Sequence, residues 1–154
     1  MLSTATLLCF FILLAVIAWI DYKTMEIPNG LVLAVLAVGM ISVFTMPGPG
    51  IRSRIAGIIV VSLPLFLITL AVPDAFGGGD IKLMAACGLF LGMKLTLLSF
   101  AFAVLGGGIY GIFLMVLKKK DKKAHFAFGP FLCGGMALGY FFGDTAWRWY
   151  LGFF

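Results

Sequence analysis

Charge is scarce in this sequence, and the scarcity excludes a soluble protein. Charged residues make up 11% of the 154 residues, 63% are hydrophobic, and the mean hydropathy is +1.18. So few polar side chains cannot cover a soluble globule with hydrated surface, so we expect an integral membrane protein. Because each membrane span uses about 20 residues, we expect residues 1–154 to form a single membrane-embedded domain.

Cysteine is also rare, and no Cys-x-x-Cys spacing occurs. Cys9, Cys87 and Cys133 lie far apart within apolar runs. This pattern favours neither a zinc site nor a disulfide framework, and we expect no metal and no cofactor. The first apolar run also lacks a preceding basic residue and an obvious small-residue cleavage site. We therefore expect a retained first span rather than a cleaved signal peptide.

Apolar runs separated by short polar, proline-rich or glycine-rich links predict an all-α bundle of about six transmembrane helices. Asn29 is a plausible N-cap for the second span. Pro64 predicts a kink in the third, and Gly92 interrupts the fourth. The predicted spans cover residues 2–20, 30–46, 55–72, 81–92, 95–117 and 126–142.

Lysine and arginine are unevenly divided between the two predicted membrane faces. Six spans put both termini on one face and the first, third and fifth links on the other. That second face carries seven of the Lys and Arg residues, five of them in the basic cluster at residues 118–123, and the first face carries four. By the positive-inside rule the seven-charge face is cytoplasmic. The cluster thus predicts topology, and we expect no nucleic-acid partner.

Three glycines and a carboxylate, Gly77-Gly78-Gly79-Asp80, stand between long apolar runs. An ionised aspartate at the edge of a span costs on the order of 3 kcal/mol, so it is rarely there for packing alone. Consecutive glycines allow backbone conformations and approaches that a side chain would forbid. Asp21 falls on the same predicted face as Asp80. If the first and fourth spans pack together, the two carboxylates can meet at the membrane rim.

Two facing carboxylates support amide hydrolysis without a metal or a covalent intermediate. Such a pair shares one proton, because like charges a few ångströms apart cannot both ionise. The ionised partner takes a proton from water while the protonated partner polarises the peptide carbonyl. All six acidic residues, however, fall in predicted links or at span ends, where solvated acids are ordinary. Spacing alone leaves both interpretations open.

Three segments resemble the type IV prepilin peptidases, which are membrane aspartyl proteases with a G-x-G-D motif. Residues 77–88, GGGDIKLMAACG, fit that motif and the G-D-x-K-L-x-A-A-x-G run that contains it. Ile20-Asp21 with Ile27-Pro28-Asn29 resembles the first aspartate segment, and Phe128-Gly129-Pro130-Phe131-Leu132 resembles the third segment. The three occur in the family's order over nearly the whole chain.

The resemblance implies a protease that removes the short basic leader of prepilins at the cytoplasmic face of the inner membrane, just before the pilin's hydrophobic helix. Asp21 and Asp80 would be catalytic, and Gly77 and Gly79 would shape the backbone beside Asp80. The residues carried over as possible substrate-binding or site-wall positions are Lys82, Pro28, Asn29, Phe128, Gly129 and Pro130.

Lys82 and two nearby acids have alternative readings. Lys82 could orient substrate, or its positive charge could favour the ionised form of the neighbouring Asp80. It could equally anchor the helix end at the membrane interface. Glu26 and Asp74 could attract a basic leader, or they could be plain loop acids.

The sequence departs from the larger bacterial members, which carry a cytoplasmic segment with paired Cys-x-x-Cys motifs and also methylate the new pilin N-terminus. That segment is missing here, so the resemblance implies a peptidase without N-methyltransferase activity. The short form is similar to the Tad/Flp-pilus prepilin peptidases and to archaeal preflagellin peptidases, which the sequence does not separate. A small proton- or cation-coupled transporter subunit and a noncatalytic secretion-assembly factor remain alternatives. The transporter interpretation would leave the three-segment match to chance.

Overall fold

The computed structural model describes residues 1–72, 76–118 and 127–152. Within these ranges the chain is almost entirely helical and contains no strand. The prediction of an all-α protein is therefore confirmed. The helices are α1 (Leu2–Thr24), α2 (Asn29–Thr45), α3 (Ile51–Val60), α4 (Ser62–Ala71), α5 (Gly78–Lys118) and α6 (Gly129–Leu151).

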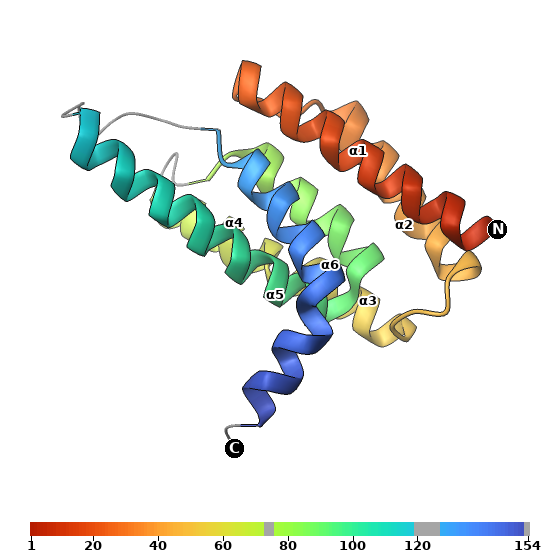
Figure 1. Ribbon diagram of the computed structural model, residues 1–154. Helices are drawn as coiled ribbons and strands as arrows, with labels where there is room; N and C mark the ends of the chain where they lie inside the picture. The colour runs from red at the N-terminus through yellow and green to blue at the C-terminus, as the bar shows by residue number, and fades with distance from the viewer. Residues whose placement is uncertain (73–75, 119–126, 153–154) are drawn as a thin grey trace.

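Two helical runs break close to where the sequence predicts an interruption. α3 ends and α4 begins around Val61, three residues before Pro64. Pro64 has no N–H to donate to the carbonyl one turn earlier, so the helix cannot continue undisturbed. Within α5, Gly92 has φ 73° and ψ 170°, a conformation that glycine adopts far more readily than other residues. The chain reverses there, and α5 consists of two halves that run in opposite directions (Figure 1).

The start of α2 and the end of α6 differ in detail from the predicted spans. Asn29 is the first residue of α2 and not its N-cap, which is Pro28 in an extended conformation. The Asn29 side chain instead accepts a hydrogen bond from Lys82, so its oxygen is already engaged by a neighbouring helix. α6 continues to Leu151, well beyond the predicted end of the sixth span.

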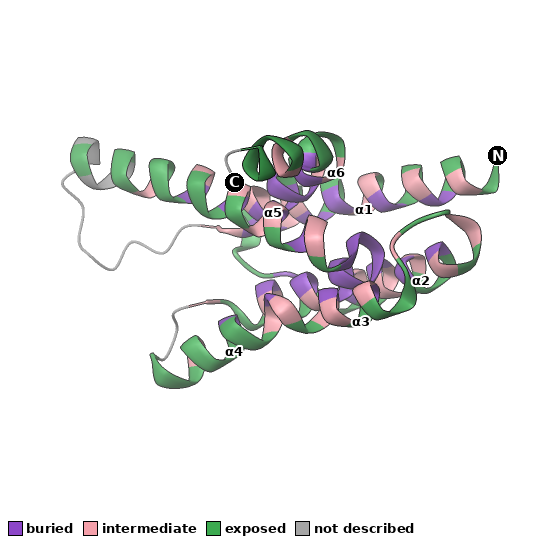
Figure 2. Cartoon of the chain, turned by 90° about the horizontal axis from the view of Figure 1, so that it is seen from below, coloured by how far each residue is buried: buried purple, intermediate pink, exposed green. Residues whose placement is uncertain are grey.

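In the part of the chain that the structure describes, three helical stretches are long and apolar enough to cross a membrane, namely Leu2–Thr24, Ile51–Ala71 and Gly78–Phe113. α2 is apolar but shorter, with 17 residues. Large apolar side chains lie exposed along α1, α4 and the second half of α5, as expected of surfaces that face lipid. Figure 2 shows α4 and the far end of α5 largely in the colour of exposed residues. These features describe a multi-pass membrane protein. The count of six spans remains a prediction.

α5 is the centre of the packing, with α2, α3 and α6 against it. The backbones of α3 and α5 touch at Gly57 and Gly88, where a Cβ on either glycine would collide with the other helix's backbone. α1 packs chiefly against α2 and α6. It also meets the first half of α5 through Phe10 and Phe90, whose rings stack with centroids 3.9 Å apart.

The links gather at two ends of the bundle (Figure 1). The α1–α2 link and the starts of α5 and α6 lie at one end, and the N-terminus and the α2–α3 link lie towards the other. Gly92 lies beside Pro49 of the α2–α3 link. Asp21 and Asp80 therefore share an end, as the predicted parity requires. Residues 119–123 of the basic cluster, and Asp74, lie outside the described residues.

Candidate active site

Asp21 lies in the last turn of α1 and is only 4% exposed. The backbone N–H of Gly129 donates a hydrogen bond to its Oδ2 over 2.9 Å. Gly129 is the first residue of α6, so the carboxylate also faces the positive end of a helix dipole. A buried carboxylate is thus held by backbone from the far end of the chain.

Gly129 leaves no room for a side chain beside Asp21. A Cβ built on this glycine would lie 2.7 Å from the Asp21 Cγ and 3.0 Å from its Cβ. Ordinary contacts of this kind lie at 3.4 Å or more. The glycine therefore allows the backbone to approach the carboxylate closely enough to donate to it.

Asp80 lies in the first turn of α5 and is 9% exposed. Its backbone N–H donates to the Gly77 carbonyl over 3.0 Å, which begins the helix. A Cβ on Gly77 would lie 3.2 Å from the Asp80 Oδ2, and a Cβ on Gly79 would lie 2.9 Å from the Ile27 Cβ. A Cβ on Gly78 would meet nothing within 4 Å. The two fixed glycines of the G-x-G-D motif are thus the crowded ones, and its variable position faces open space.

Asp21 and Asp80 line one cavity of about 240 Å³. The structure brings them together although 58 residues separate them in the sequence. Both carboxylates are largely buried, so each has few contacts with solvent outside the cavity. The remaining lining residues are Met25, Glu26, Ile27, Gly77, Gly78 and Gly79.

Two residues of the α1–α2 link line the cavity, and only one of them was predicted from the sequence to lie nearby. Glu26 was expected near the site only as one of two nearby acids, and it reaches the cavity rim. Met25 was not expected there; it adopts a left-handed conformation with φ 55° and caps α1 by donating to the Asp21 carbonyl over 2.8 Å. The position of Met25 at the cavity could not be predicted from the sequence, because non-glycine residues rarely take this conformation.

The other predicted wall residues divide between two neighbouring places. The Lys82 Nζ donates to the Asn29 Oδ1 over 3.0 Å, and both side chains line a second groove rather than the carboxylate cavity. Pro28 caps α2 between Ile27 and Asn29. Phe128 packs near Phe76, with ring centroids 6.1 Å apart. Pro130 lies in the first turn of α6, next to Gly129.

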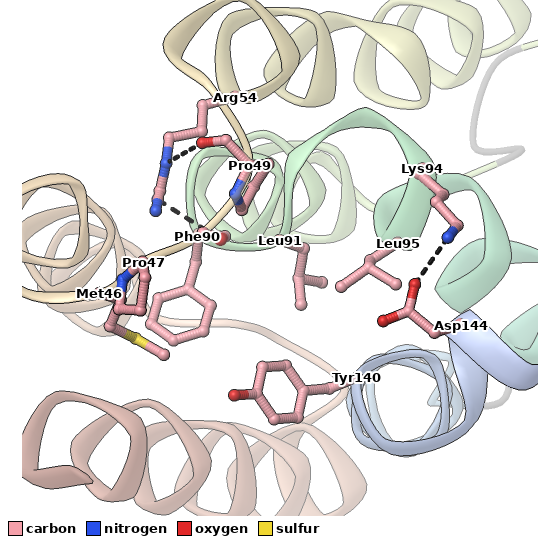
Figure 3. A pocket seen from close by; sticks show the side chains of 11 residues that line it. Met46, Pro47, Pro49, Arg54, Phe90, Leu91, Lys94, Leu95, Tyr140 and Asp144 are labelled. Atoms are coloured by element: carbon pink, nitrogen blue, oxygen red, sulfur yellow. Dashed lines mark hydrogen bonds and ion pairs between the residues drawn. The ribbon is translucent and has the colours of Figure 1, made fainter. Parts of the chain in front are cut away.

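The opposite end of the bundle holds a cavity of about 470 Å³ that contains no such carboxylate pair (Figure 3). Its one acid, Asp144, is exposed and bonded to Lys94 over 2.6 Å. Arg54 is 3% exposed and donates to neutral acceptors, including the Pro49 carbonyl, the Ser42 hydroxyl and the Leu89 carbonyl. Arg54 thus joins the end of α2, the start of α3 and the end of the first half of α5.

Potential metal ligands are sparse in the part of the chain that the structure describes. No group of three or more His, Cys, Asp or Glu side chains lies close enough there to hold a metal ion. The acidic side chains that line the cavity are those of Asp21, Asp80 and Glu26.

The family model and the relatives that match this chain are all leader peptidases. A model of the type IV leader peptidase family matches residues 8–112. The chain is 32% identical over 146 residues to the prepilin leader peptidase/N-methyltransferase of Bacillus subtilis (strain 168). The match covers 92% of this chain and 57% of that protein. It is 31% identical over 154 residues to the protein of that name from Aeromonas salmonicida (strain A449), with 97% and 53% covered. For the Legionella pneumophila protein of that name the identity is 29% over 154 residues, with 96% and 53% covered.

The chain thus spans little more than half the length of these curated relatives. No solved structure matches it. The matched family region contains both Asp21 and Asp80 and covers well over half of the sequence, and on that ground the chain belongs to the type IV leader peptidase family.

Proposed function

We propose that this protein is a membrane aspartyl endopeptidase that removes the leader peptide from prepilin precursors. The observation that carries the proposal is the single cavity lined by Asp21 and Asp80. The relatives are prepilin leader peptidase/N-methyltransferases, and that activity suggests the substrate class. Prepilins of the type IV or Flp type are therefore the proposed substrates.

Asp21 and Asp80 divide the work of peptide hydrolysis between them. One carboxylate, in its ionised form, accepts a proton from a water molecule as the oxygen of that water attacks the peptide carbonyl carbon. The other, in its protonated form, donates a hydrogen bond to the carbonyl oxygen and stabilises the charge that develops there. Collapse of the tetrahedral intermediate breaks the C–N bond, and the leaving amine takes the proton that the first carboxylate accepted from water, which returns the pair to one ionised and one protonated carboxyl group. No cofactor enters this sequence.

The backbone around the carboxylates keeps them in place for this reaction. The Gly129 N–H orients Asp21, and the turn from Gly77 to Asp80 orients the second carboxylate. Positioning of this kind matters because a displacement of about 1 Å costs on the order of a hundredfold in rate. Gly77, Gly79 and Gly129 are accordingly proposed as positioning residues, and not as groups that touch the reacting atoms.

We place the active site at the cytoplasmic face of the inner membrane. The end of the bundle that holds the cavity also holds Lys23 and Lys82, and the predicted parity adds the basic cluster to that face. Excess Lys and Arg in short links marks the cytoplasmic side. Leader removal without methylation is the proposed activity, since residues 1–154 contain no Cys-x-x-Cys motif.

The test is cleavage of a co-expressed prepilin by the wild type, Asp21→Asn and Asp80→Asn. Each Asn variant keeps the side-chain shape but cannot take both protonation states, so we expect leader removal by the wild type alone. Asp144→Asn is the matched control, because Asp144 is exposed at the other end of the bundle. Cleavage by either active-site variant would refute the carboxylate mechanism, and a transporter subunit or assembly factor would be indicated if the wild type cut no prepilin. Mass spectrometry of the mature product reports whether its N-terminus carries a methyl group.

A further inference from the structure

An apolar groove of about 490 Å³ opens beside the carboxylate cavity, between α2, α3 and α5. On α2 its residues are spaced three and four apart, from Asn29 to Leu36, so they form one stripe along the helix. On α5 they are Lys82, Ala85 and Ala86, and Ile58 of α3 completes the lining. Apart from Asn29 and Lys82, the lining carries only aliphatic side chains.

The groove and the cavity are built from the same two chain segments. Residues 25–27 line the cavity and Asn29 lines the groove; residues 77–80 line the cavity and Lys82 lines the groove. The hydrogen bond from Lys82 to Asn29 marks the boundary between them. A substrate lying across that boundary would meet two carboxylates on one side and an apolar channel on the other.

The channel has the shape that a second helix needs in a membrane. Helices associate in lipid through close packing, which small residues permit. Ala85 and Ala86 leave space on the α5 side, while Leu33, 64% exposed, stands at the α2 wall. From Asn29 to Leu36 the stripe runs about 10 Å along the helix axis, which corresponds to about two turns of a docked helix.

We infer that this groove seats the first turns of the substrate's apolar helix, so that the bond before that helix lies at Asp21 and Asp80. The inference rests on the proposed function and adds to it a docking surface with named residues. Ala85 and Leu33 are thereby specificity-determining positions, and neither touches the reacting atoms. A lipid acyl chain is the competing occupant of the groove.

Ala85→Leu tests the inference by filling the groove. Two substrates are compared: a complete prepilin, and a short peptide that crosses the cleaved bond but lacks the apolar helix. We expect Ala85→Leu to raise KM for the complete prepilin about tenfold and to leave cleavage of the short peptide unchanged. Ala101→Leu is the matched control, since Ala101 is exposed on the second half of α5. It should behave as the wild type with both substrates.

A photo-crosslinking side chain at residue 33 gives a second readout, which does not depend on turnover. In the Asp80→Asn background, we expect position 33 to crosslink to the complete prepilin and position 101 not to do so. Wild-type kinetics for Ala85→Leu, or crosslinks from position 33 to lipid only, would overturn the groove assignment while leaving the peptidase intact. A wild type that cuts neither substrate would overturn the proposed function, and the groove assignment with it.

Discussion

Replacing Gly129 with alanine should inactivate the protein without unfolding it. The added Cβ would lie 2.7 Å from the Asp21 Cγ, and ordinary contacts begin at 3.4 Å. The carboxyl group must therefore move by about 1 Å, or α6 must withdraw, and either change breaks the 2.9 Å hydrogen bond from the Gly129 N–H. A shift of that size at a catalytic group corresponds to a loss of about a hundredfold in rate.

Gly134→Ala is the matched control, because it introduces the same methyl group on the same helix. A Cβ at Gly134 would meet nothing within 4 Å. We expect unchanged cleavage and a gain of up to about 1 kcal/mol in stability, the usual difference between alanine and glycine inside a helix.

The assay is the initial rate of prepilin cleavage in detergent, measured beside the melting temperature of each purified variant. The expected pattern is a large loss of rate for Gly129→Ala at a melting temperature close to that of the wild type. Equal rates for the two alanine variants would refute the assignment of Gly129 as the residue that orients Asp21. A collapse in the melting temperature of Gly129→Ala alone would assign it to folding instead.

Two further comparisons use neighbouring residues as controls. Gly77→Ala should slow cleavage about tenfold, because its Cβ would lie 3.2 Å from the Asp80 Oδ2, whereas Gly78→Ala has open space and should cleave normally; the reverse order in initial rates would contradict this account of the motif. Arg54→Met should lower the free energy of unfolding by about 2 kcal/mol by leaving buried carbonyls without a donor. The exposed Arg52→Ala should change it little, and equal melting of the two variants would show that the Arg54 contacts do not stabilise the fold.

Much of the candidate site could be predicted from residue identity. Asp21 and Asp80 are conspicuous because carboxylates at the ends of apolar runs are costly, and the surrounding motifs resemble a family with a known pattern. The contacts that the motif residues make could be predicted less well from the sequence. Gly129 was expected only as a wall or loop-shaping position, and Asn29 was expected to cap α2. In the structure Gly129 donates to Asp21, and Asn29 accepts from Lys82.

The sequence by itself determined the membrane class, the helical content and the breaks near Pro64 and at Gly92. These are properties of composition or of single residues: apolar runs exclude water, proline lacks a donor, and glycine tolerates positive φ.

Only the tertiary structure decided which faces of the helices meet. On α1 the buried residues include Phe10 and Ile17, yet Leu8 and Trp19 on the exposed face are just as apolar. A membrane helix is apolar all round, because lipid and neighbouring helices favour the same side chains, so its periodicity does not mark the buried side. The contact between Asp21 and Gly129, 108 residues apart, depends on how each helix is rotated about its own axis, which the sequence pattern does not show.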